Sequence, residues 1–160
     1  MKMIQHPIPP LYDERSSVLI LGSFPSVKSR KTAFFYGHPQ NRFWRVLAQL
    51  FEAPVPNTIL EKKALVLDHH LALWDVIAAC DIEGSADSSI RNVVPNDLSV
   101  ILDHVPIRHI FVNGRKAEAL YKKYLFPVIG INAGCLPSTS PANAGWSLER
   151  LIDAWSVILQ

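Results

Sequence analysis

Polar and aromatic side chains gather in three segments of the chain, residues 22–41, 74–89 and 133–146. The first segment ends at Asn41, whose amide can orient a water molecule although it is a poor base. The second contains Asp75, whose carboxylate can accept a hydrogen bond from an N–H group of a ligand. The third is rich in hydroxyl groups, which can bind phosphate oxygens. These side chain types are suited to positioning a ligand and a water molecule.

The sequence offers no pattern for a metal ion or a nucleotide cofactor. Its six histidines show no HExxH spacing, and Cys80 and Cys135 form no CxxC pair. Neither a P-loop nor a GxGxxG pattern is present, which argues against an unrelated doubly wound enzyme such as a phosphatase. Lys28 and Lys31 are expected to be solvated, so we predict hydrolysis by water and not Schiff-base chemistry. We therefore expect neither a metal nor a cofactor.

Short apolar runs alternate with helical patterns along the chain. The run Val18-Leu19-Ile20-Leu21 ends at Gly22 and predicts a fully buried strand. Apolar runs also predict strands at residues 71–77, 107–112 and 128–131. Helices are expected over residues 43–51, from 58 to about 70, from 96 to before 106, over 115–124 and from 147 onward. Thr58 and Glu61 fit a capping box at the second of these helices.

The alternation of strands and helices indicates a three-layer α/β/α sandwich with a central, mostly parallel four-stranded sheet. In such a sheet, ligands bind beyond the carboxyl ends of the strands. The first and third polar segments follow the predicted strands at residues 18–21 and 128–131, and the second includes the end of the predicted strand at residues 71–77. We therefore expect the three segments to meet at one edge of the sheet, with residues 23–40 and 132–145 largely in loops.

The chain has 160 residues, of which 49% are hydrophobic and 19% charged, and this composition predicts one globular domain over residues 1–160. No apolar run approaches the roughly 20 residues needed to cross a bilayer, so no membrane association is expected. The N-terminus lacks the apolar core of a secretory signal, and a cytoplasmic location is expected. A net charge of +2 neither requires nor opposes a polyanionic partner.

The polar segments contain three longer motifs. They are GSFPS at residues 22–26 followed by YGHPQNRFW at 36–44, LPSTSPAN at 136–143, and LALWDV at 71–76. In order and spacing they resemble the motifs of mismatch-specific uracil and thymine glycosylases, within the uracil-DNA glycosylase superfamily. There the first motif is a Gly-x-x-Pro loop, an aromatic residue and a Pro-x-Asn-x-Phe-Trp helix start, and the Pro/Ser-rich loop enters the DNA duplex. The resemblance spans most of the chain and implies a uracil-DNA glycosylase-like fold and DNA glycosylase activity.

One position departs from that family pattern. The relatives place a catalytic Asn or Asp inside the Gly-x-x-Pro loop, where this chain has Ser23 and Phe24. The hypoxanthine-DNA glycosylase branch has the same loss, and there the important polar residue is an Asn that corresponds to Asn41. The resemblance therefore implies a monofunctional enzyme of base excision repair. Its substrate would be a deaminated base, preferably hypoxanthine, flipped out of double- or single-stranded DNA.

The resemblance assigns the catalytic role to Asn41, which would hold the attacking water near C1′ of the sugar. The alternative is that Asn41 caps the helix that follows it, since Asn is a favoured N-cap residue. Tyr36 would stack on the flipped base, or else fill the core. Gly22, Ser23 and Phe24 would complete the base site, with backbone N–H groups of this loop serving the base oxygen.

Asp75 is expected to read the base. It would accept a hydrogen bond from N1–H of hypoxanthine, a donor that adenine lacks. The alternatives are that Asp75 caps a turn or pairs with Arg91. Trp74 would flank the bound base or lie in the core.

The Pro/Ser-rich loop is expected to contact DNA, through phosphate oxygens and by wedging into the base stack. The residues concerned are Ser138, Thr139, Ser140, Pro141, Ala142 and Asn143. An ordinary surface loop is the alternative. His38 would contact a phosphate or the departing base, or hydrogen-bond within its own loop. The protein is expected to act as a monomer.

Two other functions remain open. One is a mismatch-specific uracil or thymine glycosylase acting on G·U pairs, which base preference would distinguish. The other is a catalytically silent module that binds DNA lesions or nucleotides, with strong, salt-dependent binding and no base release.

Overall fold

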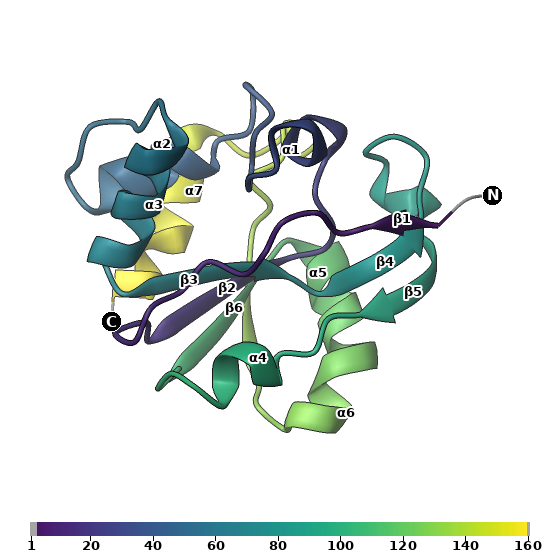
Figure 1. The fold of residues 1–160 in the computed structure, drawn as a ribbon. Coiled ribbons are helices and arrows are strands. Elements are labelled where there is room, and N and C mark those ends of the chain that lie inside the picture. The colour runs from purple at the N-terminus through teal and green to yellow at the C-terminus, as the bar shows by residue number, and fades with distance from the viewer. Residues whose placement is uncertain (1–2, 160) are drawn as a thin grey trace.

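Four parallel strands form the central sheet of the computed structural model, which describes residues 3–159 (Figure 1). The sheet order is β3-β2-β6-β7, with bounds β2 Val18–Gly22, β3 Leu71–Asp75, β6 His109–Asn113 and β7 Ala133–Leu136. β2 is paired in register with β3 on one side and β6 on the other. The carboxyl ends of these strands therefore meet at one edge of the molecule.

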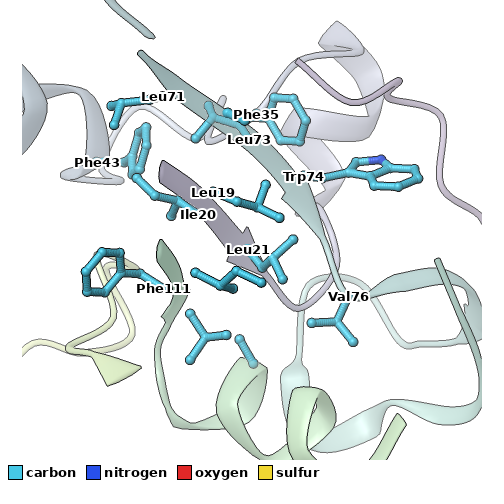
Figure 2. Close-up of a cluster of buried hydrophobic side chains, with 14 of the residues drawn as sticks. Leu19, Ile20, Leu21, Phe35, Phe43, Leu71, Leu73, Trp74, Val76 and Phe111 are labelled. Carbon is cyan, nitrogen blue, oxygen red and sulfur yellow. The ribbon is translucent and has the colours of Figure 1, made fainter. Parts of the chain in front are cut away.

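The apolar run at residues 18–21 does form a buried strand, since all five residues of β2 are buried. Leu19, Ile20 and Leu21 lie at the centre of a core that also contains Phe43 and Phe111 (Figure 2). A strand covered on both faces needs apolar side chains at every position, which explains the continuous run.

Helices cover both faces of the sheet, which confirms the expected three-layer α/β/α sandwich (Figure 1). On one side lie α2 (Phe43–Leu50), α3 (Ile59–Asp68) and α7 (Leu148–Trp155); on the other lie α4 (Ser99–Leu102), α5 (Arg115–Leu120) and α6 (Phe126–Ile129). The short helix α1 (Val27–Thr32) lies within the segment after β2.

Local signals placed the starts of α3 and α7 well, whereas the helix expected from residue 96 begins only at Ser99. The Thr58 hydroxyl accepts from the Glu61 backbone N–H while the Glu61 carboxylate accepts from the Thr58 N–H, so the capping box is present. Ser147 caps α7 by accepting from the backbone N–H of Arg150. The helix expected over residues 115–124 is α5, which continues through a wider helical turn over Tyr121–Leu125.

The strand expected at residues 128–131 is wrong. Those residues belong mainly to α6, where Pro127 occupies the first turn, the part of a helix that tolerates a missing N–H. Gly130 ends α6 in the left-handed conformation. The fourth strand is β7, three residues further on, inside the segment expected to be a loop.

The strand expected at residues 71–77 is divided between two sheets. β3 ends at Asp75, and after Val76 the chain enters β4 (Ile77–Asp81), which pairs antiparallel with β1 (Ile4–Gln5) and β5 (Arg91–Pro95). At the bend, the Val76 N–H donates to the Gly22 carbonyl at 2.8 Å. This second sheet, for which the sequence gives no local signal, brings the N-terminal segment close to the end of β3.

Candidate active site

A cavity of about 340 Å³ lies at the carboxyl ends of β2, β3 and β6, within the size range of small-molecule sites. Its lining includes residues from all three polar segments, which confirms that they meet at this edge. The lining residues discussed below are Gly22, Ser23, Phe24, Tyr36, His38, Asn41, Asp75, Asp87, Asn113, Ser138, Thr139, Ser140, Pro141 and Ala142.

Asn41 lies at the cavity wall just before α2. Its side chain Oδ1 accepts from the backbone N–H of Phe43 at 2.9 Å, so Asn41 satisfies the first free N–H of α2, although Arg42 and not Asn41 occupies the N-cap position. Because Oδ1 accepts this hydrogen bond, the amide NH₂ group is the part of the side chain that can donate to a water molecule or a ligand in the cavity. Capping and a role in the cavity are therefore compatible, and the cap fixes the orientation of the amide.

Tyr36 provides an aromatic wall of the cavity. Its ring stacks on Phe43 with centroids 4.0 Å apart and an interplanar angle of 23°. Its backbone adopts φ 51°, an unusual conformation for a bulky residue and one that loops at functional sites often contain. Burial raises the pKa of its phenol, and the Asp75 carboxylate raises that pKa further, so the hydroxyl remains protonated. Within residues 3–159, this buried hydroxyl has no hydrogen-bond partner.

Asp75 lies at the end of β3 and is held by a residue that the sequence analysis missed. Its Oδ2 accepts from Nε2 of His6 at 2.7 Å, and both side chains are at most 5% exposed. Oδ1 lies beside Gly22, where a Cβ would come within 2.4 Å of it. Asp75 does not pair with Arg91, whose guanidinium donates instead to the backbone carbonyls of Ser88 and Ile90. His6 precedes Asp75 by 69 residues, so no local spacing could have revealed the pair.

Trp74 lies in the core, which is one of the two positions that the sequence left open. The indole N–H donates to the carbonyl of Ile8 at 3.3 Å, and the side chain lies outside the residues that line the cavity. Phe24 is 8% exposed, lines the cavity and lies under the guanidinium of Arg30 at 5.4 Å.

A second carboxylate, Asp87, lies at the cavity rim and was not among the expected site residues. The Ser23 hydroxyl donates to Asp87 Oδ1 at 3.2 Å. Partial burial raises the pKa of the Asp87 carboxyl; the Ser23 bond and Lys116 oppose this effect, while Asp75 adds to it. Its sequence context, an exposed polar loop, gave no signal that distinguished it from other surface acids.

The loop at residues 137–146 is tied to the sheet through Asn113, at the end of β6. The Asn113 amide donates to Thr139 Oγ1 at 3.0 Å and accepts from the Thr139 N–H at 3.1 Å. Thr139 is fully buried, so it has no exposed surface for the phosphate contact expected of it. The hydroxyls of Ser138 and Ser140 accept from backbone N–H groups of the same loop and remain half-buried at the cavity.

The same loop is tied to α2 through Arg42. Its guanidinium donates to the carbonyls of Ser140 and Asn143 at 3.0 Å each and also to that of Trp146. Asn143 also donates its side chain to the Ser138 carbonyl at 3.0 Å. Pro141 and Ala142 lie at the rim, Ala142 exposed, where a wedge would be placed.

His38 lines the cavity and accepts from the Gln40 N–H through Nδ1 at 3.1 Å, so the local hydrogen bond that the sequence left open is present. Within residues 3–159, no group of three or more His, Cys, Asp or Glu side chains is arranged to hold a metal ion. None of the helices described is long and apolar enough to cross a membrane.

Fold and cavity together define an α/β enzyme whose ligand binds where parallel strands end. The family model of the uracil DNA glycosylase superfamily matches residues 9–158. The chain belongs to this superfamily, and it is a DNA glycosylase, a hydrolase of N-glycosyl bonds.

Similar proteins agree with this membership. A protein named hypoxanthine DNA glycosylase from Methanosarcina acetivorans is 39% identical over 150 residues, covering 92% of this chain and 94% of the relative. Its namesake from Methanosarcina barkeri is 32% identical, with coverage of 92% and 93%. The solution NMR structure of a candidate uracil DNA glycosylase from M. acetivorans superimposes with a TM-score of 0.80 at 36% identity, covering 99% and 97% of the two chains.

Proposed function

We propose that this DNA glycosylase releases hypoxanthine that has been flipped out of DNA, as the first step of base excision repair. The observation that carries the proposal is the buried Asp75 carboxylate, which lines the cavity with one oxygen held by His6. A fixed acceptor at the end of β3 suits a base edge that presents an N–H group. Both relatives named above as hypoxanthine DNA glycosylases support this choice of base.

Base selection follows from the hydrogen-bonding pattern. Hypoxanthine presents an N1–H donor beside its O6 acceptor, whereas the unprotonated N1 of adenine is itself an acceptor. An unmatched polar pair in a buried site costs about 1–3 kcal/mol, so Asp75 would discriminate against adenine. Backbone N–H groups of the Gly22–Ser23–Phe24 loop would serve O6.

The hydrolytic step rests on Asn41 and a water molecule. The first loop carries Ser23 and Phe24 where a carboxylate or amide would activate water, so the cavity relies on orientation by the Asn41 amide. The rate then depends on stabilising the departing purine anion and the sugar cation. The negative charges of Asp75 and Asp87 would favour the cation, whereas the purine anion would depend on N–H donors of the first loop. Tyr36 would stack on the base, a contact worth on the order of 1–3 kcal/mol.

DNA would lie across the cavity mouth. We assign phosphate and stack contacts to His38, Ser138, Ser140, Pro141, Ala142 and Asn143, and the role of holding the loop to the buried Thr139. One chain supplies every residue that lines the cavity, so a monomer would suffice on either double- or single-stranded DNA.

The test is release of free base from labelled oligonucleotides that carry hypoxanthine, uracil, xanthine or adenine, at excess enzyme. Hypoxanthine should be released fastest. Uracil also presents an N–H group between two carbonyls, and Asp75 could accept a hydrogen bond from it. Faster release of uracil would therefore establish a uracil glycosylase instead. Binding without release of any base would identify a silent lesion-binding module.

Asp75→Asn tests the reading of the base edge. His6 donates to this side chain, so the amide oxygen of the new residue would face His6 and its NH₂ group would face the cavity. The variant should lose hypoxanthine release by roughly 10-fold or more while the relative rate on adenine rises. An unchanged ratio of the two rates would remove Asp75 from base selection.

A further inference from the structure

His6 and Asp75 form a buried polar pair at the wall of the cavity. The His6 ring lies edge-on to Phe24 at 5.9 Å and to Trp74 at 6.5 Å between ring centroids. The His6 and Asp75 side chains are only 3% and 5% exposed. A buried carboxylate without a partner is strongly destabilised, so the pair is expected to be rigid.

The tautomer of His6 is fixed by the backbone. The N–H of Ile8 donates to Nδ1 of His6 at 3.2 Å, so in the neutral ring Nδ1 is unprotonated and Nε2 carries the hydrogen. Nε2 therefore donates to Oδ2 of Asp75. This hydrogen bond occupies one defined oxygen of the Asp75 side chain.

The second sheet holds His6 in this place. β1 pairs with β4, the His6 N–H donates to the Ala78 carbonyl at 2.8 Å, and Ile8 is buried at 3% exposure. β4 follows β3 after a single residue, so the strand that ends in Asp75 and the segment that carries His6 are held together. The N-terminal segment thus acts directly on the base-reading carboxylate.

Gly22 restricts Asp75 from the opposite side. Oδ1 lies so close to its Cα that a Cβ there would stand 2.4 Å away, and Tyr36 Oη would be 3.2 Å from the same Cβ. The carboxylate is therefore confined between His6 behind and Gly22 beside it. Oδ1 is the oxygen left to meet a ligand in the cavity.

We propose that His6 is a positioning residue that fixes the Asp75 carboxylate as a one-oxygen acceptor, and thereby sets the preference for bases with an N–H group next to a carbonyl. The inference rests on the proposed function, because it concerns the base that Asp75 reads. Without the His6 donor, nothing would hold Oδ2, and the carboxylate could rotate. It would then no longer present a fixed acceptor to N1–H of the base.

Two substitutions separate positioning from mere packing. His6→Met introduces an apolar side chain of similar length and removes the donor. His6→Gln keeps an N–H donor that can reach Oδ2. His104→Gln is the control, because His104 is exposed, follows α4 and does not line the cavity. Each variant is compared with the wild type on hypoxanthine and on 1-methylhypoxanthine in DNA, the latter lacking N1–H, under single-turnover conditions.

His6→Met should lower hypoxanthine release on the order of 10-fold or more and leave the slower 1-methylhypoxanthine reaction nearly unchanged, so that the preference between them collapses. His6→Gln should restore most of the preference, and His104→Gln should match the wild type. Titration of both free bases into enzyme bound to abasic-site DNA measures the same preference even where the methylated base is not released.

Equal loss on both bases in His6→Met, without rescue by His6→Gln, would show a purely structural role and overturn the proposal. If the wild type released uracil and not hypoxanthine, the proposed substrate would be wrong, but uracil and 3-methyluracil then provide the same comparison. The ratio of the release rates of uracil and 3-methyluracil would then test the positioning role of His6.

Discussion

Gly22 and Asp75 are register partners in β2 and β3, and only a residue without a side chain leaves room for the carboxylate there. A Cβ at Gly22 would lie 2.4 Å from Asp75 Oδ1, and His6 prevents Asp75 from moving back. We therefore expect Gly22→Ala to displace the carboxylate and lower single-turnover base release by about 100-fold, the effect of a misplacement near 1 Å.

The melting temperature of Gly22→Ala, followed by circular dichroism, shows whether the loss is local. A folded variant with low activity is the expected result. Wild-type rates would mean that Asp75 can adopt another position without consequence, which would contradict its role as a fixed acceptor.

Asp87 is expected to carry a cost in stability. Because its pKa is raised in the folded protein, its ionised form is less favourable there than in the unfolded chain. Asp87→Asn should therefore raise the melting temperature at neutral pH, and the gain should shrink as the pH falls and vanish below about pH 3, where the carboxyl is protonated in both states. Thermal melts across this pH range measure the effect.

Asp97→Asn is the matched control with the opposite sign. Hydrogen bonds from the Ser99 hydroxyl and backbone N–H lower the pKa of the Asp97 carboxyl. Removing its charge should lower the melting temperature at neutral pH and have less effect in acid. A lower melting temperature at neutral pH in both variants would show that the surroundings of Asp87 do not disfavour its charge.

At the scale of single residues, sequence motifs identified many of the side chains that line the cavity, but they missed Asp87 and Asn113 in the lining and His6, which holds Asp75. Asn41 and Asp75 lie in recognisable motifs at predicted element ends. His6, Asp87 and Asn113 act on partners far away in the sequence, and each looks like an ordinary polar residue in its own context.

At the scale of elements, Arg42 joins the start of α2 to the 137–146 loop by donating to three backbone carbonyls. Without this guanidinium the middle of the loop should be held less firmly. The ties that remain are at Asn113, at the Arg42 backbone N–H, which donates to the Thr139 carbonyl, and at the two ends of the loop. We expect Arg42→Met to slow base release from duplex DNA by about 10-fold, since hydrogen bonds to charged groups contribute roughly 1.5–3 kcal/mol each.

Release from single-stranded DNA should change much less, because no partner strand has to be separated there. Arg45→Met, at the neighbouring exposed arginine of α2, serves as the control and should match the wild type. Equal losses on duplex and single strand would place the effect of Arg42 in the chemical step and not in entry of the loop.

The predicted elements succeeded where a local pattern decides the structure and failed where tertiary contacts decide it. The apolar run of β2 and the capping box before α3 are local signals. β7 contains Gly134 and has two exposed residues, so it carries no apolar pattern, whereas residues 128–131 are apolar but helical. The antiparallel sheet depends on pairing between β1 and β4, which no single segment reveals.

At the scale of the whole molecule, a second hollow of about 860 Å³ adjoins the cavity and shares Asp87, Ser138, Ser140 and Ala142 with it. Arg115, exposed at the start of α5, lines this hollow together with the carboxylates of Asp87 and Glu118, and we infer that its guanidinium contacts the DNA backbone. We expect Arg115→Ala to weaken DNA binding equally for all lesions and to reduce the slope of log affinity against log salt by about 1.

Fluorescence anisotropy at several salt concentrations measures that slope. Lys63→Ala, an exposed lysine of α3 that lines neither hollow, controls for the change in net charge. Equal slopes for Arg115→Ala and the wild type would mean that the backbone follows another path.

Base release by two variants at Asn41 tests most directly whether this cavity hydrolyses the glycosidic bond with an oriented water. Asn41→Ser keeps an acceptor for the Phe43 N–H and hence the cap of α2, whereas Asn41→Ala removes both the cap and the amide. Both variants should bind hypoxanthine-containing DNA as the wild type does and release the base at least about 100-fold more slowly. Release at the wild-type rate by Asn41→Ser would reduce Asn41 to a helix cap and contradict the mechanism.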